Sequence, residues 1–332
     1  MLPRRLERVH LCALPELLEG QHGFDRRRLL QDGARHPVGR GVRARRGRGP
    51  ARRHPLLRRP EIPRQRHVVT LHHPPGSTGH RAFAEQLFRE YEDITLPLHG
   101  RLSAQDKRDG SAVTEADQAA SAHVLRRLVA HTPEIGVISE EEAESYLPTA
   151  RRQWAIDPLD GTASFARGLP VWGLGMGLID GPTPVSGYLH FPVPRQTFIY
   201  EDGTALLNGE PMPVRPGSLA ADTLNIMITA IHDVIDVRRV EGYRLHNLGS
   251  NLYHLMMLAA GRCDAIITGP CYLWDIAPAL PFTRALGHVE RYLDGSTLDL
   301  ADLLKPDYGF PVRQPMLIGP TDIVEELITR LA

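Results

Sequence analysis

The N-terminal segment of this chain is polar. Beyond it, apolar residues recur with two different periods, one typical of helices and one typical of strands. From Arg81 to about Leu102 the segment FAEQLFREY predicts an amphipathic helix, and ADQAASAHVLRRLVAH predicts a second one after Thr114. VWGLGMGLI, VSGYLHFPV and TFIYE predict successive strands separated by Gly and Pro turns. Beyond Leu206 strands mix with helices: NLYHLMMLAAG predicts a buried helix that ends at Gly261, and CDAIITG a strand.

The segment WAIDPLDGT predicts a buried strand that ends in an acidic turn. We expect Asp157 to stand where the backbone leaves the sheet. Pro158 lacks an N–H and fixes φ, so the chain is expected to turn and bring Asp160 back beside Asp157. The following ASFA predicts a short helix, stopped at Gly168, whose N-terminus would face an anion. Taken alone, the segment is equally typical of an ordinary acidic turn.

Three further acidic clusters favour a functional site. Each stands at the edge of an apolar segment: Asp117 in VTEADQAA, Glu140 in GVISEEEAE, and Asp275 in LWDIAPALP. Carboxylates gathered in one cleft repel one another and take up protons unless cations neutralise them. Oxygen ligands favour hard ions, so Mg²⁺ is expected rather than zinc. Two such ions about 4 Å apart can serve the entering and leaving oxygens of a phosphoryl displacement.

The charge distribution divides the chain into two segments. Residues 1–80 hold 18 arginines and 6 acids, and the 39 basic and 39 acidic residues of the whole chain leave 21 and 33 for the remainder. The first segment, rich in Arg, Pro and Gly, is predicted to be disordered. Nucleic-acid binding is not expected of it, because aromatic stacking residues are scarce beside the arginines. A start codon assigned too far upstream would explain it equally well.

Hydropathy and cysteine content favour the cytoplasm. No stretch approaches the length needed to span a membrane, and LCALPELL is too short and too acidic for a signal peptide. Cys12, Cys263 and Cys271 show no CxxC spacing, and three thiols in a chain of 332 residues indicate a reducing compartment.

From Arg81 to Ala332 the chain resembles the inositol monophosphatase family of magnesium-dependent, lithium-sensitive phosphatases. Four motifs in order carry the resemblance: ISEE, WAIDPLDGTASF, LLNGEPMPV and LWDIAPALPFTRALG. It implies an α/β (α+β) fold, a layered αβαβα sandwich of the inositol monophosphatase and fructose-1,6-bisphosphatase type. The expected organisation is a disordered extension at residues 1–79, a metal-binding subdomain at 80–200 and a subdomain at 201–332 that completes the cleft. By analogy with relatives, a homodimer is expected.

The same resemblance implies roles for particular residues. Two or three Mg²⁺ ions would be held by Glu140, Asp157, the Leu159 carbonyl, Asp160 and Asp275. Asp117 and Thr162 would orient the attacking water, with Glu140 also in the catalytic set. The Gly161 and Thr162 amides would hold phosphate, and the substrate pocket would be lined by Gly249, Ser250 and Asn251.

Two positions bear on specificity. Relatives commonly use a glutamate seven residues before the C-terminal aspartate to contact inositol hydroxyls, and this chain has Thr268 there. Arg244 can equally meet an anionic group of the substrate or form a surface salt bridge.

These features predict a Mg²⁺-dependent phosphomonoesterase for a small phosphorylated metabolite such as inositol monophosphate. Histidinol phosphate is an alternative, because ITLPLHGR, VTEADQAA and GLPVWG resemble the bacterial histidinol-phosphatase branch. A sugar bisphosphate stays open, whereas Ala163 and Ser164 after DGT disfavour a bisphosphate nucleotidase. The competing class is a non-catalytic phosphate-binding or nucleic-acid-binding protein that uses the arginine-rich segment.

Overall fold

The computed structural model describes residues 79–101, 105–106, 112–113, 115–141, 150–212, 225–228, 235–240, 243–305, 311–312 and 314–331. Contacts divide the chain into Met1–Ile62 and Pro63–Ala332, and every described residue belongs to the second unit. The arginine-rich segment and the predictions made for it, including Cys12, lie outside the described residues.

The larger sheet of the described unit has seven strands. Its order follows the sequence, with β3 parallel to β4 and every later neighbour antiparallel. The strands are β3 (Gly136–Ser139), β4 (Arg152–Asp160), β5 (Gly173–Asp180), β6 (Thr183–Phe191), β7 (Gln196–Glu201), β8 (Thr204–Leu207) and β9 (Glu210–Pro211).

A second sheet of five strands has the order β11-β10-β12-β16-β14. Its strands are β10 (Asn225–Ile228), β11 (Arg244–His246), β12 (Ala265–Thr268), β14 (Val289–Tyr292) and β16 (Met316–Gly319). Two short antiparallel pairs complete the described strands: β1 (Gln105–Asp106) with β2 (Ala112–Val113), and β13 (Cys271–Tyr272) with β15 (Pro311–Val312).

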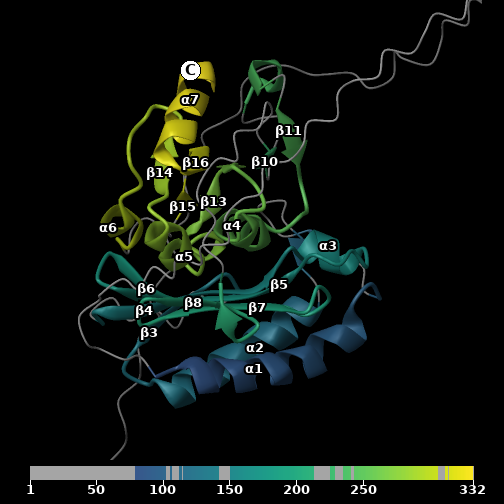
Figure 1. The fold of residues 1–332 in the computed structure, drawn as a ribbon. Coiled ribbons are helices and arrows are strands. Elements are labelled where there is room, and N and C mark those ends of the chain that lie inside the picture. The colour runs from purple at the N-terminus through teal and green to yellow at the C-terminus, as the bar shows by residue number, and fades with distance from the viewer. Residues whose placement is uncertain are drawn as a thin grey trace, which may run out of the picture. The chain divides into compact units, whose positions relative to one another are not determined.

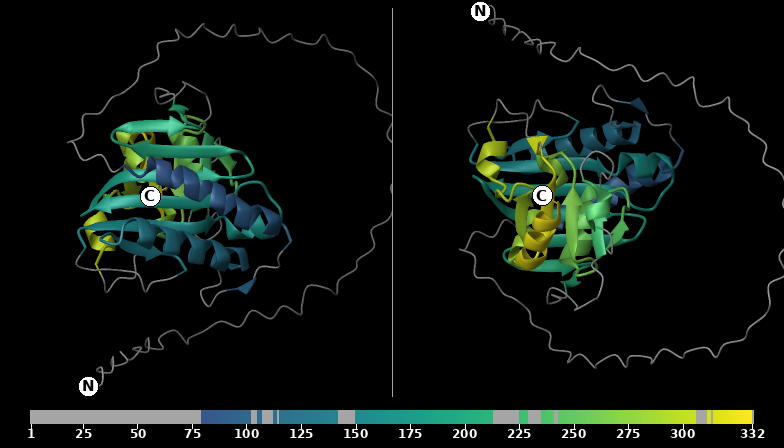
Figure 2. Two further views of the ribbon diagram at one scale, coloured as in Figure 1. Left: turned by 90° about the horizontal axis from the view of Figure 1, so that it is seen from below. Right: turned by 90° about the horizontal axis from the view of Figure 1, so that it is seen from above.

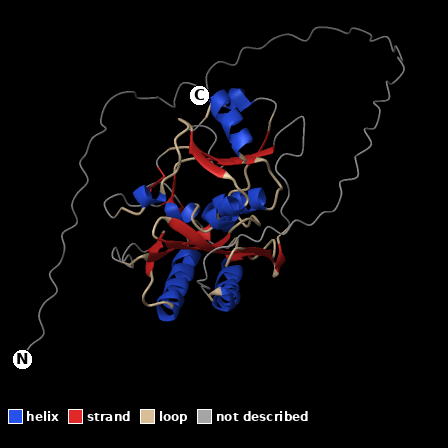
Figure 3. Cartoon of the chain, turned by 60° about the vertical axis from the view of Figure 1, so that its left-hand side comes forward, coloured by secondary structure: helices blue, strands red, loops and turns tan. Residues whose placement is uncertain are grey.

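Helices and sheets alternate in five layers, as Figure 1 shows and Figure 3 repeats from another side. Helices α1 and α2 cover one face of the seven-stranded sheet, α4 and α5 lie between the two sheets, and α7 covers the second sheet. The predicted αβαβα sandwich is therefore confirmed. The described helices are α1 (Arg81–Thr95), η1 (Leu96–Leu98), α2 (Glu115–His131), α3 (Thr162–Ala166), η3 (Val237–Val240), α4 (Asn251–Ala259), η4 (Leu273–Asp275), α5 (Leu280–Ala285), α6 (Leu300–Leu303) and α7 (Thr321–Leu331).

Helix α1 ends earlier than the sequence pattern predicted. Its buried face is formed by Ala84, Leu87, Phe88, Tyr91 and Thr95, which recur at helical spacing. The α-helix stops at Thr95 and continues only as the three-residue turn η1, which contains Pro97. The expected run to Leu102 is therefore wrong, because Pro97 has no N–H to donate to the carbonyl four residues before it and so cannot continue the α-helical pattern.

Strand β4 extends further than predicted. The sequence placed Asp157 where the chain leaves the sheet, but β4 runs through to Asp160. Its ladder with β5 shifts register between these two aspartates, so Pro158 and Leu159 have no partner there. From Gln153 to Asp160 every residue is buried, because helices cover both faces of the sheet. Both aspartates are thus held by a buried strand rather than by a mobile loop.

Glycines on β5 and β6 let the chain between η4 and α5 approach the sheet closely. A methyl group on Gly177 would lie 2.7 Å from the backbone nitrogen of Pro278, and one on Gly187 would overlap the Pro278 carbonyl oxygen. Pro278 is the third residue after Asp275. The packing at Pro278 therefore sets the position of Asp275 relative to β4.

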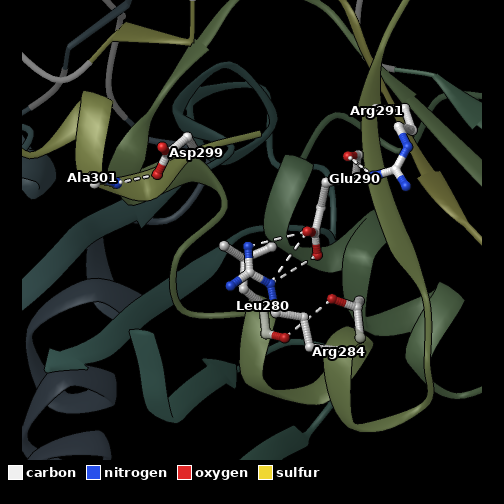
Figure 4. Close-up of polar contacts among 7 residues, drawn as sticks. Leu280, Arg284, Glu290, Arg291, Asp299 and Ala301 are labelled. Carbon is white, nitrogen blue, oxygen red and sulfur yellow. Dashed lines mark hydrogen bonds and ion pairs between the residues drawn. The ribbon is translucent and has the colours of Figure 1, made fainter. Parts of the chain in front are cut away.

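An ion pair holds the far end of this segment to the second sheet (Figure 4). The Arg284 guanidinium on α5 donates to both carboxylate oxygens of Glu290 on β14, at 3.1–3.2 Å. Glu290 is only 4% exposed, so the pair fixes α5 against β14 in a largely dry setting.

Among the described helices, none is long and apolar enough to cross a membrane.

Gly187→Ala tests the close packing of η4 and α5 against the sheet. We expect a loss of about 1–3 kcal/mol in the free energy of unfolding, because the added methyl group meets backbone that cannot swing aside. Urea denaturation measures it. Thr183→Ala, an exposed position on the same strand, is the control and should change stability by less than about 0.5 kcal/mol. Equal effects of the two substitutions would contradict the packing argument.

Candidate functional site

The parallel pairing of β3 with β4 brings Glu140 to Asp157. Ser139 is the register partner of Ile156, and the Glu140 N–H donates to the Ile156 carbonyl at 3.2 Å. Glu140 is the residue after Ser139, and Asp157 is the residue after Ile156. The two acidic residues are therefore brought to the same level of the paired strands. The Asp157 side chain is 1% exposed, and its Oδ1 accepts a hydrogen bond from the Leu159 N–H at 3.0 Å.

Asp160 lies against the N-terminus of α4. Its carboxylate accepts hydrogen bonds from the Ser250 hydroxyl, from the Asn251 N–H at 3.1 Å and from the Leu252 N–H at 3.0 Å. Ser250 is also the N-cap of α4, since its Oγ accepts from the Tyr253 N–H at 3.0 Å. Ser250 and Asn251, predicted to line the substrate pocket, thus anchor one of the predicted metal ligands, and the helix dipole favours the negative charge there.

Thr162 and Asp117 meet at the first turns of two helices. The Thr162 hydroxyl lies 2.7 Å from Asp117 Oδ1 and 3.1 Å from the Leu159 carbonyl oxygen, so it can donate to either. Asp117 is in the first turn of α2 and is 1% exposed, and Thr162 is the first residue of α3. The sequence placed these residues together only through the family resemblance.

Two glycines allow the α3 and α4 loops to touch. Gly161 caps α3 with a φ of 85°, and a methyl group there would lie 2.9 Å from the Val171 carbonyl and 3.0 Å from the Gly249 carbonyl. Gly249 has a φ of 82°, and a methyl group on it would overlap the Ser164 hydroxyl. Both positions therefore require glycine for conformation and for space. This close approach seats the N-terminus of α4 on the end of β4.

Asp275 joins the cluster from the C-terminal half of the chain. Its Oδ2 accepts from the Tyr272 N–H at 2.6 Å, and its backbone carbonyl accepts from Asn251 Nδ2 at 2.8 Å. The turn η4 that ends at Asp275 contacts both β4 and β5. Asp157 and Asp275, 118 residues apart in the sequence, are therefore electrostatic neighbours.

The cluster raises the pKa values of its buried members. Burial, followed by repulsion from Glu140, Asp160 and Asp275, raises the pKa of Asp157 well above its usual range. Burial also raises the pKa of Asp160 to about 6, although its hydrogen bonds from Ser250 and α4 oppose the rise. Both shifts show that these carboxylates lack a compensating positive charge among the described residues.

Two buried polar atoms beside the cluster have no hydrogen-bond partner among the described residues. They are the Tyr91 hydroxyl oxygen and the Asn251 side-chain oxygen Oδ1. Tyr91 lies on the sheet side of α1, and burial, followed by the charges of Asp157 and Asp117, raises the pKa of its hydroxyl well above the usual range. Tyr91 carries no functional signal at the level of sequence, because it occupies one of the regular apolar positions of the helix.

The donor set fits a hard divalent cation. Carboxylate oxygens and the buried Leu159 carbonyl are the ligands that Mg²⁺ prefers, and the raised pKa values mark negative charge that a cation would balance. Within the described residues, no three acidic, histidine or cysteine side chains form a group that could hold an ion as they stand. The site is thus a set of neighbouring carboxylates rather than a closed coordination shell.

The remaining predicted positions are placed as follows. Thr268 on β12 is 1% exposed, and its hydroxyl donates to the Gly269 carbonyl at 2.8 Å. Arg244 is exposed on β11, an edge strand. Cys263 is buried and Cys271 partly buried, and both are free thiols.

Comparison with known proteins identifies phosphatases among the relatives of this chain. The chain is 29% identical over 217 residues to a histidinol-phosphatase of Chlorobaculum parvum, a match that covers 61% of this chain and 82% of that protein. It is 26% identical over 215 residues to a fructose-1,6-bisphosphatase/inositol-1-monophosphatase of Thermotoga maritima, covering 62% of this chain and 81% of the relative.

The fold matches solved structures of inositol monophosphatases. One, an IMPase/NADP phosphatase complexed with Mg²⁺ and phosphate, superposes with a TM-score of 0.63 at 19% identity, covering 75% of this chain and 92% of that one. The Inositol monophosphatase family model matches residues 80–320. The chain therefore belongs to the inositol monophosphatase family, as the motifs predicted. By its family it is a phosphoric monoester hydrolase.

Asp157→Asn tests the electrostatic strain of the cluster. In metal-free protein at pH 8 we expect the free energy of unfolding of the variant to be about 1–3 kcal/mol higher than that of the wild type, because one buried repelling charge is removed. The folded-state pKa values are raised, so the folded protein holds protons that the unfolded chain releases, and wild-type stability falls as the pH rises. For Asp160, the rise of the pKa from 3.8 to about 6 corresponds to about 3 kcal/mol of folding stability, which is lost as the pH rises between those two values.

The measurement is urea denaturation with EDTA between pH 4.5 and pH 8. The advantage of Asp157→Asn should grow with pH as the wild-type carboxylates ionise. Asp202→Asn, an exposed aspartate in the turn between β7 and β8, is the matched control and should follow the wild type. A wild type more stable than Asp157→Asn at pH 8 without metal would show that the carboxylates are not strained.

Proposed function

We propose that the chain is a Mg²⁺-dependent phosphomonoesterase that hydrolyses a small phosphorylated metabolite. The observation that carries the proposal is the contact between the Thr162 hydroxyl and Asp117, beside the buried pair Asp157 and Asp160. A hydroxyl held by a carboxylate next to a strongly anionic cluster is suited to directing water at a phosphate. The Mg²⁺-bound and phosphate-bound solved relative supports the choice of ion.

Glu140, Asp157, Asp160, Asp275 and the Leu159 carbonyl would hold the ions. Mg²⁺, when bound, supplies positive charge at the phosphate oxygens and at the departing alkoxide. The number of ions, two or three, stays a prediction. Asn251, whose amide nitrogen donates to the Asp275 carbonyl, would keep η4 and α4 in register around this ligand set.

The chain's own groups would handle the water and its proton. Thr162 donates to Asp117, so its oxygen lone pair can accept a hydrogen bond from a water molecule and direct it at phosphorus. The water oxygen would form a bond to phosphorus while the ester oxygen departs with the bonding electron pair and takes a proton from solvent, and Asp117 would accept the water proton relayed through Thr162. Backbone amides of Gly161 and Thr162 would hold the phosphate at the start of α3.

The substrate remains a proposal within this class. Inositol monophosphate is the first candidate, but Thr268 supplies no charged group and its hydroxyl is occupied by the Gly269 carbonyl. The histidinol-phosphatase relative favours histidinol phosphate as the second candidate, and the bisphosphatase named in the other relative keeps sugar bisphosphates in the test panel. The cytoplasm as compartment and a homodimer as assembly stay predictions.

Thr162→Ala tests the proposed chemistry. We expect the rate constant kcat for phosphate release to fall by about 10²–10⁴-fold, because the group that directs the water is lost. Thr162→Ser keeps the hydroxyl and should lose less than about tenfold. The measurement is release of inorganic phosphate from inositol, histidinol, sugar and nucleotide phosphates, with Mg²⁺ present or chelated.

Thr183→Ala, at an exposed position of β6 that is remote from the site, is the control and should retain wild-type turnover. Wild-type turnover by Thr162→Ala would rule out the proposed role of the hydroxyl. Release that persists in excess chelator would rule out dependence on Mg²⁺. No release from any substrate would favour the non-catalytic phosphate-binding alternative.

A further inference from the structure

A cavity separate from the acidic site lies between α1 and the hairpin strands of the seven-stranded sheet. The cavity has a volume of about 360 Å³. Helix α1 contributes Glu85, Phe88, Arg89 and Glu92 to its wall, and β6, β7 and the β8–β9 turn complete it. Figure 2 shows α1 lying across this face of the sheet. None of the lining residues belongs to the acidic site.

A buried histidine forms the fixed polar wall of this cavity. His190 lies with its Nε2 2.9 Å from Glu92 Oε1 and its Nδ1 2.8 Å from the Thr197 hydroxyl. Its side chain is 8% exposed, and burial lowers its pKa in spite of Glu92. A neutral ring can donate to Glu92 while it accepts from Thr197, which leaves the Glu92 carboxylate negative and held in place.

The opposite wall is set by a tight turn. Asn208 and Gly209 have φ values of 53° and 82° and join β8 to β9, as an Asn-Gly hairpin turn requires. Asn208 Oδ1 accepts from the Thr197 N–H at 2.8 Å, which ties the turn to β7. The wall therefore does not depend on a flexible loop.

Charges of both signs face this space above an apolar floor. Glu85, Arg89 and Glu92 follow one another at helical spacing on α1, so they lie on one face. Arg89 is exposed and forms no ion pair with a described residue. The floor is the Phe88 ring, stacked on His190 with centroids 5.0 Å apart, together with Ile199.

From this arrangement we propose that the cavity binds a free α-amino acid with an apolar or aromatic side chain. The ligand ammonium is placed at Glu92, the carboxylate at Arg89 and the side chain on Phe88 and Ile199. An ammonium and a carboxylate on one carbon satisfy both charges at once, which neither a simple amine nor a simple acid can do. The volume falls within the range of small-molecule pockets.

This site shares strand pairings with the acidic cluster. Asp160 is the register partner of Gly173 on β5, the next residue Leu174 pairs with His190, and His190 pairs with Thr197. The two sites are therefore joined through adjacent strands while they use different residues. The proposal does not rest on the phosphatase function, and its test needs no turnover.

The test is titration calorimetry of the full chain with L-phenylalanine, phenethylamine and 3-phenylpropanoate. The last two probes each lack one of the two charges. We expect L-phenylalanine to bind with a Kd of about 1 mM or tighter, and each of the others at least about tenfold more weakly. Arg89→Gln should remove the advantage over phenethylamine, and Glu92→Gln the advantage over 3-phenylpropanoate.

Arg262→Gln, an exposed arginine after α4, is the control and should bind like the wild type. Thermal unfolding of each variant checks that it is folded. No binding of L-phenylalanine to the wild type at 10 mM would overturn the proposal. So would undiminished binding to folded Arg89→Gln and Glu92→Gln, or equal binding of the three probes.

Discussion

Repulsion among buried carboxylates is the constraint on which the rest of this structure depends. Asp157 and Asp160 lie on a strand covered on both faces, with Glu140 and Asp275 as charged neighbours. Such a cluster opposes folding unless protons or cations balance it. A chain selected for stability alone would place apolar residues at these positions. Its persistence in the centre of the molecule therefore argues for cation binding, since only a cation turns the repulsion into attraction.

The surrounding elements are arranged to hold this unfavourable charge in place. The N-terminus of α4 donates two backbone hydrogen bonds to Asp160, and Ser250 adds a third while it caps the helix. Glycines at positions 161, 177 and 187 remove the side chains that would keep α3, η4 and α5 at a distance. Hydrogen bonding and close packing thus stabilise a geometry that the charges alone would disrupt.

Local periodicity predicted individual helices and strands, whereas the layers and the gathering of the acidic residues were implied by the family resemblance. Helix and strand periods identified α2, β5, β6 and α4, and motif order placed Asp157 and Asp275 in one site. The end of α1 and the extension of β4 were missed, since a proline effect and burial by distant helices decide them. Tyr91 was missed because a core tyrosine and a tyrosine beside a carboxylate cluster have the same helical spacing.

The roles of Ser250 and Asn251 show why site residues are harder to predict than elements. The family pattern assigned both to the substrate pocket, whereas their described contacts are with Asp160 and the Asp275 backbone. The two roles are compatible, because a residue that fixes a ligand's orientation also shapes the space beside it. Asn251 keeps one buried acceptor with no partner in the described part of the chain, while its side-chain nitrogen donates to the Asp275 carbonyl. That acceptor is where a water or a substrate donor would gain most, since a buried unpaired oxygen is costly to leave unsatisfied.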